Sequence, residues 1–355
     1  KNMRCNQSII GVLDNENIIA YNVKFENNFE VEIINLGGVI TKIITPDKDN
    51  NFENIVLGYE NINDYIENPY YYGAIIGRTS GRICEGHIKI EDKEYKLNKN
   101  YGLHQGHGGN FGFNHKIWDV QVKEKSDCVS LILSRKSPHL EENYPGNLDV
   151  EVTFNIYENY KIEEVYKCKS DKTTIVNMTN HSYFNLNGEG SGTAMDQYLT
   201  IHAKYYTPVA DSHSIPTGVY EEVAGTPMDF STAKQIGQDI EAEFEQLKFT
   251  GGYDHNYVTD NYAKGNRRLI ATAYSDKTEI AMDVTSDCPC VQFYAANFVE
   301  NEHGKNGHTY NKRDAFCLET QVEPNAVNVE DFHSPILNAG EQYDSVTAYH
   351  FYIRK

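Results

Sequence analysis

The chain has 355 residues, enough for a large hydrophobic core, and carries 32 basic against 51 acidic residues, a formal net charge of −19. Nucleic-acid binding requires clustered Lys and Arg, so this balance argues against it and makes a neutral small molecule an easier ligand than an anion. No run of about 18 apolar residues is present, so we expect no membrane-spanning helix.

The N-terminus and the cysteines indicate the cellular compartment. Residues 1–10 are polar and show no signal-peptide pattern. The seven cysteines are odd in number and irregularly spaced, which predicts reduced thiols and a cytoplasmic location. The Cys288-Pro-Cys290 pair is too short for the Cys-x-x-Cys spacing of zinc and redox sites, so we interpret it as structural.

Alternation of apolar and polar residues with a period of two dominates the chain. The segments with this pattern are residues 30–36, 87–97, 148–157, 269–274 and 347–353. In residues 148–157, for example, Val150, Val152, Phe154 and Ile156 share one face and polar residues share the other. Many such strands, separated by Asn, Asp, Gly and Lys turns, predict an all-β protein with antiparallel sheets.

Helical patterns are scarce. Residues 61–67 are compatible with one helical turn. In residues 231–248, apolar side chains recur at helical spacing, and Ser231 is a candidate N-cap, so a helix is predicted there. Strands do not alternate with helices, no repeat of fixed period is found, and no linker divides the chain. We therefore expect a single domain over residues 1–355 with a few short helices.

Five parts of the chain place polar residues where an ordinary strand or turn would be apolar or plain. They are residues 77–83, residues 102–113, residues 177–188, residues 251–257, and the pair formed by residues 291–297 and 316–322. The third part follows a β-type run at 173–176 and centres on His181, whose side-chain type titrates nearest neutrality. The last part places Glu319 within an apolar strand, where an unpaired carboxylate is costly.

Each of these residues also has a purely structural interpretation. Arg78 and Arg82 are compatible with surface or ion-pairing roles, and Asp254 with capping of a turn. The histidines of residues 102–113 are compatible with a polar Gly-rich loop, and His181 with a hydrogen-bonded core position. Taken one at a time, the segments do not decide between structure and function.

Taken together and in order, the segments resemble the aldose 1-epimerase family over nearly the whole chain. The matching motifs are Gly77-Arg with Gly-Arg-Ile83, Leu103-His104, Lys116-Ile-Trp118, Tyr144-Pro-Gly146, Thr179-Asn-His-Ser-Tyr-Phe-Asn-Leu186, Ile215-Pro-Thr-Gly218, Tyr253-Asp-His-Asn256, Val291-Gln-Phe-Tyr294 and Cys317-Leu-Glu-Thr-Gln321. The resemblance implies a large antiparallel β-sandwich with an open sugar-binding cleft. It implies an isomerase that interconverts the α and β anomers of free hexoses such as galactose or glucose.

The resemblance also implies roles for individual residues. Glu319 is implied as the general base and His181 as the general acid. The implied substrate-binding residues are Arg82, His104, Tyr183, Asp254 and Gln292. The family often has Asn where this chain has Gly81, so one sugar contact is expected to be missing or replaced by water. The histidine loop is longer than usual, so His104 and His107 both remain candidates, and the preceding Leu103 favours His104.

Anomer exchange suits these residue types. One proton must leave the C1 hydroxyl and one must reach the ring oxygen while the ring opens to an aldehyde. Glu and His titrate near roughly 4.3 and 6.5 when unperturbed, and we expect the nearby carboxylate to favour a charged His181 imidazolium as the proton donor. No hydride moves, and neither nucleotide loops nor paired metal-ligand spacings are visible, so we expect no cofactor and no metal.

Three alternatives stay open. A non-catalytic carbohydrate-binding protein on the same sandwich would bind sugar without exchanging its anomers. A hexose-6-phosphate 1-epimerase would need a cationic cluster, which the net charge disfavours. A glycoside hydrolase or lyase would need two carboxylates, with Asp254 as the second. The sequence leaves the preferred aldose open, and it predicts a neutral monosaccharide as ligand and either a monomer or a homodimer.

Overall fold

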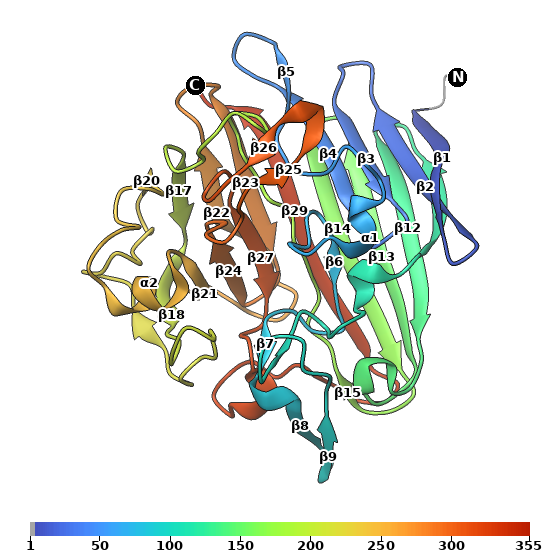
Figure 1. Ribbon diagram of the computed structural model, residues 1–355, viewed down its shortest axis with the longest axis vertical. Coiled ribbons are helices and arrows are strands. Elements are labelled where there is room, and N and C mark those ends of the chain that lie inside the picture. Colours follow the sequence, from blue (N-terminus) through green and yellow to red (C-terminus); the bar gives the residue numbers. More distant parts are fainter. Residues whose placement is uncertain (1–3) are drawn as a thin grey trace.

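The computed structural model, which describes residues 4–355, consists mainly of antiparallel strands arranged in one broad sheet and two smaller ones (Figure 1). Residues 1–3 of the polar N-terminal segment lie outside the described part. The broad sheet contains, in spatial order, β11 (Asp119–Glu124), β12 (Cys128–Ser137), β13 (Leu148–Tyr157), β14 (Lys161–Ser170), β29 (Gln342–Ile353), β23 (Ile280–Ser286), β22 (Arg268–Tyr274), β17 (Tyr198–Ile201) and β20 (Lys234–Gln235).

The two smaller sheets have five strands each. One contains β1 (Cys5–Leu13), β2 (Glu16–Lys24), β3 (Glu30–Ile34), β4 (Ile40–Pro46) and β5 (Phe52–Asn54). The other, which we name the site sheet, contains β19 (Glu221–Glu222), β18 (Ala203–Thr207), β21 (Asp254–Thr259), β24 (Cys290–Tyr294) and β27 (Cys317–Gln321).

Short elements complete the fold. The two-stranded pairs are β6 (Ile75–Ile76) with β16 (Thr179–Asn180), β7 (Arg82–Ile83) with β10 (Gln105–Gly106), β8 (His87–Ile90) with β9 (Lys93–Lys96), β15 (Thr174–Ile175) with β28 (Ile336–Leu337), and β25 (Glu302–His303) with β26 (Thr309–Tyr310). The helical elements are α1 (Asp64–Glu67), α2 (Glu245–Thr250), and the 3₁₀ turns η1 (Cys84–Gly86), η2 (Phe113–His115), η3 (Glu141–Asn143), η4 (Lys305–Gly307) and η5 (Ala326–Asn328). Neither α-helix of the described residues has the length and apolar character needed to cross a bilayer.

One continuous hydrophobic core joins the three sheets. Val31 of β3, Val152 of β13 and Phe293 of β24 all belong to it and are fully buried. Inward-facing apolar residues from facing sheets make the core of a β-sandwich. The predicted all-β antiparallel class is therefore confirmed, including the scarcity of helices.

Most of the segments in which apolar and polar residues alternate form strands. The predicted segment 148–157 coincides with β13, and the last predicted strand lies within β29. The segment 87–97 differs, because it folds into the β8–β9 hairpin, which projects at the bottom of Figure 1. Glu91 and Asp92 both have positive φ, 50° and 64°, which a tight two-residue hairpin turn requires.

The helix predicted for residues 231–248 is mostly wrong, because only α2 is helical. Ser231 does not cap a helix: its backbone N–H and its Oγ both bond to Oδ1 of Asp229, at 2.9 and 2.6 Å, in a local turn. Residues 234–235 then pair with β17 as edge strand β20. Ile236 is buried as the pattern predicted, but in a turn rather than on a helix face. The helical turn expected within 61–67 is present as α1.

Candidate active site

The site sheet forms one wall of a cavity of about 300 Å³. In this sheet Gln292 of β24 lies directly opposite Glu319 of β27, and Asp254 of β21 opposes Tyr294. Side chains two residues apart on a strand share a face, so Gln321 also points to the side of Glu319. These residues all line the cavity, and the alternation of three neighbouring strands explains why they converge there.

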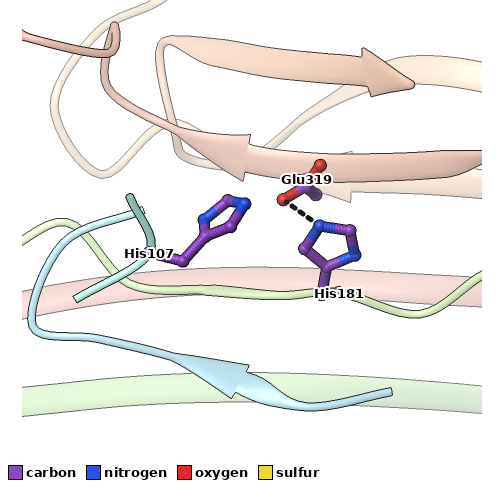
Figure 2. Close-up of side chains that lie close together, drawn as sticks. All are labelled: His107, His181 and Glu319. Carbon is purple, nitrogen blue, oxygen red and sulfur yellow. Dashed lines mark ion pairs between the residues drawn. The ribbon is translucent and has the colours of Figure 1, made fainter. Parts of the chain in front are cut away.

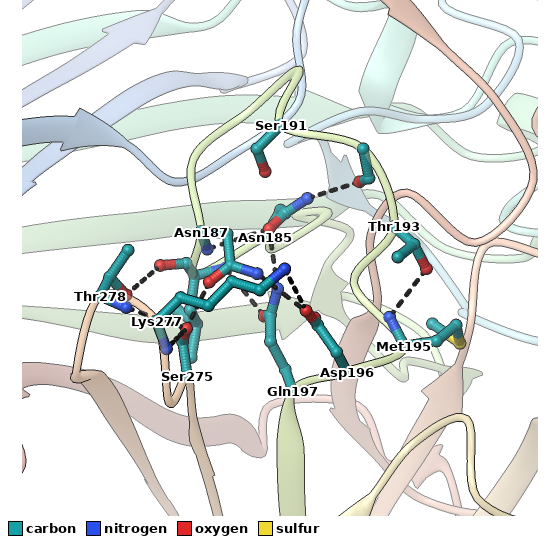
Figure 3. A network of polar contacts seen from close by, with 12 residues as sticks. Asn185, Asn187, Ser191, Thr193, Met195, Asp196, Gln197, Ser275, Lys277 and Thr278 are labelled. Carbon is teal, nitrogen blue, oxygen red and sulfur yellow. Dashed lines mark hydrogen bonds and ion pairs between the residues drawn. The ribbon is translucent and has the colours of Figure 1, made fainter.

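His181 reaches the same cavity from a different segment. Its backbone N–H donates to the carbonyl of Ala74 at 2.9 Å, and its own carbonyl accepts from Gly73 at 3.1 Å. Further along the segment, Asn185 and Gln197 are fully buried and belong to a polar network (Figure 3). The Gln197 amide donates to Asn185 Oδ1 at 2.8 Å, so the segment after the histidine is also fixed.

His181 and Glu319 face each other across the cavity. The distance from Nε2 of His181 to Oε1 of Glu319 is 3.3 Å, and Figure 2 shows both side chains pointing at each other with His107 beside them. Both residues are buried. Oε1 of Glu319 nevertheless has no hydrogen-bond partner of good geometry, so this oxygen is free to accept a proton or a hydroxyl group.

Aromatic rings enclose the imidazole of His181. Tyr183 stacks on it with ring centres 5.2 Å apart, and Tyr71 stacks at 5.8 Å. The ring of His107 meets it edge-on at 5.1 Å. On its other side, Nδ1 of His181 lies 3.7 Å from the thiol sulfur of Cys317. The ring therefore presents Nε2 to Glu319 and is held by packing on several sides.

A chain of polar contacts fixes the residues around Asp254. The Gln292 amide donates to Oδ1 of Asp254 at 2.9 Å, and the Gln321 amide donates to Oε1 of Gln292 at 3.1 Å. Arg82 lies 3.8 Å from Oδ2 of Asp254, and its guanidinium stands over the ring of Tyr101 at 4.5 Å. Because each amide has its donor and acceptor ends assigned by a neighbour, the polar wall is pre-organised for a ligand.

Burial controls the charges of the site. Desolvation raises the pKa of Glu319 well above its usual range, Asp254 raises it further, and Arg82 opposes both. Desolvation also lowers the pKa of His181 to about 3, with Arg82 acting in the same direction. The expectation that the carboxylate keeps His181 charged is therefore wrong, because desolvation is the largest effect on the pKa of His181. Near neutral pH the imidazole is neutral there.

Most of the residues predicted from sequence meet in the cavity. Its lining includes His181, Glu319, Arg82, Tyr183, Asp254, Gln292, Gly81 and His107. Tyr183 contributes a ring that supports His181, while its hydroxyl donates to the carbonyl of Tyr70 at 2.9 Å. The backbone N–H of Gly81 donates to Nδ1 of His107 at 3.2 Å. The other ring nitrogen, Nε2, therefore points away from this bond.

His104, which the sequence favoured over His107, does not line the cavity. Its Nδ1 accepts the backbone N–H of Glu85 at 2.9 Å, and its ring contacts His213. The loop therefore places the second histidine, not the first, beside His181. His107 has a positive φ of 45°, a conformation that the sequence did not indicate.

Several lining residues were missed by sequence reasoning. Gln321 could have been found, because it follows Glu319 by two positions on the same strand. Tyr71 had no such signal, since its place over the two histidines depends on a turn with a φ of 61°. Arg78 was interpreted as a surface or ion-pairing residue, but it is buried outside the cavity and donates to several backbone carbonyls, including that of Gly146 at 2.8 Å. It is a structural residue.

The donor atoms of His107, His181 and Glu319 lie within 4.8 Å of one another, close enough to hold a metal ion. The same three groups are also suited to proton transfer, because a carboxyl and two imidazoles surround one space. A ligand with several hydroxyl groups would find hydrogen-bond donors and acceptors on most sides of this cavity.

Comparison with known proteins agrees with these features. The family model described as aldose 1-epimerase matches residues 20–350. Galactose mutarotase from Bos taurus is 36% identical over 328 residues, which cover 92% of each chain. Aldose 1-epimerase from Escherichia coli (strain K12) is 31% identical over 324 residues, 90% of this chain and 91% of that one. The solved structure of galactose 1-epimerase from Lactobacillus acidophilus NCFM aligns over 100% of both chains with a TM-score of 0.88 and 25% identity.

Proposed function

The chain belongs to the aldose 1-epimerase family and is an isomerase, and we propose that Glu319 and His181 interconvert the α and β anomers of a free hexose by moving its two exchangeable protons. One observation carries this assignment: the Glu319 carboxyl and the His181 imidazole lie 3.3 Å apart in a cavity of about 300 Å³. Such a cavity is at the small end of the range for ligand sites, which suits a single sugar ring.

The proton count of the pair stays constant through the reaction. When the ring opens, the Glu319 carboxylate takes the proton of the C1 hydroxyl, the bond from C1 to the ring oxygen breaks, and the His181 imidazolium protonates that oxygen. The C1–C2 bond of the aldehyde then rotates. On closure the ring hydroxyl returns its proton to His181 and attacks the other face of C1, while Glu319 returns its proton to the carbonyl oxygen. The pair holds one proton throughout.

The pKa shifts of the two residues correspond to the middle of this cycle. With the pKa of His181 lowered to about 3 and that of Glu319 raised, the shared proton resides on the carboxyl group. The cyclic sugar needs the other arrangement, with the proton on the imidazole. We propose that sugar hydroxyls hydrogen-bonding to the Glu319 carboxylate supply the stabilisation that moves this proton.

The remaining lining residues hold the sugar. We assign Arg82, Asp254, Gln292 and His107 to its hydroxyl groups, because all four line the cavity; contacts among the first three order them, and the Gly81 backbone holds His107. Gly81 offers no side chain at the position where the family often has Asn, so we assign the missing contact to a water molecule or to the histidine loop.

The charge of the cavity favours a neutral monosaccharide over a sugar phosphate. Among the described residues that line it, Arg82 is the one Lys or Arg, and it lies beside Asp254. Glu319 adds a second acidic group. A phosphate group would therefore meet two carboxyl groups and one shared cation, an unfavourable balance.

Polarimetry on freshly dissolved α-galactose and α-glucose tests the proposal. We expect the optical rotation to relax faster in proportion to enzyme concentration, with no cleavage of disaccharides in a parallel assay. Sugar binding without faster relaxation would indicate a carbohydrate-binding protein, and cleavage would indicate a hydrolase. A rate series over galactose, glucose, xylose and arabinose identifies the preferred aldose.

We also propose a cytoplasmic location and a monomer or homodimer of single-domain chains. All seven cysteines carry free thiols, which suits a reducing compartment. Size-exclusion chromatography with light scattering measures the oligomeric state.

A further inference from the structure

A second cluster of metal-ligating side chains lies outside the sugar cavity. It contains Cys290 of β24, Glu323 just after β27, and His333 in the segment between η5 and β28. Their donor atoms lie within 4.8 Å of one another, and none of the three residues lines the sugar cavity. We propose that Cys290, Glu323 and His333 bind one divalent cation of the zinc class.

The ligand types select the class of cation. A thiolate, an imidazole and a carboxylate are the three side-chain groups that bind Zn²⁺. Mg²⁺ and Ca²⁺ prefer oxygen ligands and have little affinity for sulfur. Three protein ligands leave a fourth position of a tetrahedral ion for water, and the side chain of His333, 32% exposed, brings the cluster close to solvent.

The charge balance also favours a cation. Cys290 and Glu323 are both fully buried. Glu323 now accepts hydrogen bonds from Nδ1 of His333 at 3.0 Å, from the His333 backbone N–H at 3.2 Å, and from the hydroxyl of Tyr220. A divalent cation matches the combined charge of one thiolate and one carboxylate.

Binding exchanges protons for the cation in a balanced way. The Cys290 thiol loses its proton to solvent and forms the sulfur–metal bond. His333 binds the ion through the lone pair of Nδ1 and carries its ring proton on Nε2. Glu323 stays ionised and exchanges its bond to Nδ1 for the metal. The thiol proton of Cys290 is released for each cation bound.

Strand geometry explains why the cluster forms beside the sugar cavity. Cys290 precedes Gln292 by two residues on β24 and shares its face of the sheet, and Glu323 lies two residues beyond Gln321, the partner of Cys290 on β27. Cys288 is not part of the cluster, because its sulfur lies 3.1 Å from the hydroxyl of Ser345. The short Cys288-Pro-Cys290 spacing is thus irrelevant to metal binding, since only one of the two thiols participates.

Cobalt spectroscopy on the full chain tests the site. Titration with Co²⁺ should produce a near-ultraviolet thiolate-to-cobalt charge-transfer band that saturates at one equivalent and disappears when Zn²⁺ is added. The variants Cys290→Ser and His333→Gln should each lose this band. His333→Gln is the safer variant for folding because its side chain is partly exposed, and circular dichroism and mutarotation rates verify the fold of both.

A matched control separates this site from the sugar cavity, where His107, His181 and Glu319 offer another cluster. The variant His181→Asn should keep the cobalt band unchanged. The proposal is overturned if the wild-type chain gives no thiolate band at saturating Co²⁺, or if folded Cys290→Ser keeps it. Loss of the band in His181→Asn together with its retention in His333→Gln would place the ion in the sugar cavity and overturn it equally.

Discussion

Nε2 of His181 and Oε1 of Glu319 lie 3.3 Å apart in a buried cavity, yet no aligned hydrogen bond joins them. A structural ion pair would be expected to align, because an unpaired buried carboxylate is costly. The unsatisfied Oε1 of Glu319 and the lowered pKa of His181 together indicate that the pair is suited to binding a polar ligand.

Removing either member of the pair should abolish most of the catalysis. We expect Glu319→Gln and His181→Asn each to lower kcat for mutarotation by roughly 10²- to 10⁴-fold, the usual contribution of one positioned proton transfer. Polarimetry measures the rate, and circular dichroism verifies the fold. Because the two residues act as a unit, the double variant should lose little more than the worse single variant. Near-normal rates in both single variants would contradict the proposed roles.

The pH dependence should reflect the pair rather than an ordinary histidine. The active pair holds one proton, so activity falls at low pH when a second proton binds and at high pH when the first is lost. Because the pKa of His181 is lowered to about 3, the acidic fall should lie far below the usual imidazole range. We expect kcat/KM to stay nearly constant between about pH 7 and pH 5. A tenfold loss for each pH unit below about 6.5 would contradict this.

Replacing Asp254 should shift the alkaline limb of the pH profile of kcat/KM. Its carboxyl group raises the pKa of Glu319, an effect second only to desolvation. In Asp254→Asn this repulsion is gone, so the pKa of Glu319 falls and the pair loses its proton at a lower pH. The kcat/KM profile of the variant, measured by polarimetry from pH 6 to 10, should therefore decline earlier than that of the wild type. A decline at higher pH would refute the sign.

The sheets were predictable because alternation reports which face of a strand is buried. The alternation that includes Val150 to Ile156 predicted the bounds of β13 correctly. Alternation along β24 and β27 likewise places Gln292 and Glu319 on one face. The helix prediction for residues 231–248 was mostly wrong because Ser231 bonds locally to Asp229 and the residues that follow form an edge strand. The spacing of apolar residues does not reveal either feature.

The residue types of the site could be predicted from the sequence, but the geometry of its loops and the charge of His181 could not. Glu319 was identified because a carboxylate within an apolar strand is costly, and His181 because its polar segment resembles the aldose 1-epimerase motif. The choice between His104 and His107 depended on a backbone turn with positive φ, which the residue types did not specify. The charge of His181 depended on desolvation by rings such as Tyr71, whose position is set by contacts distant in sequence.

The two loop histidines should differ sharply in their effect on the reaction. His107 touches His181 and lines the cavity, whereas the His104 ring lies outside it. We expect His107→Asn to lower kcat/KM by roughly tenfold, the loss of one or two sugar hydrogen bonds. His104→Asn should stay within about twofold of wild type. Polarimetric rates of the matched pair decide the assignment, and a larger loss in His104→Asn would restore the sequence-based choice.

Glu164 should make the protein less stable as pH rises, independently of catalysis. It lies on β14 with 1% exposure, its Oε2 accepts the hydroxyl of Tyr166 at 2.9 Å, and its Oε1 has no partner. Desolvation raises its pKa to about 8. In the unfolded chain the carboxyl ionises near roughly 4.3, so between that pH and about 8 only the unfolded state gains from ionisation.

The free energy of unfolding should therefore fall as pH rises through this window, by at most about 1.4 kcal/mol per pH unit from this residue, and level off above pH 8. Glu164→Gln, which keeps the shape without the charge, should flatten the decline, whereas Glu151→Gln at an exposed position of β13 should leave it unchanged. Urea midpoints at pH 5, 6.5 and 8 for the three chains measure the effect. An identical slope in wild type and Glu164→Gln would show that this carboxyl is ionised in the folded protein, and that water or a cation reaches it.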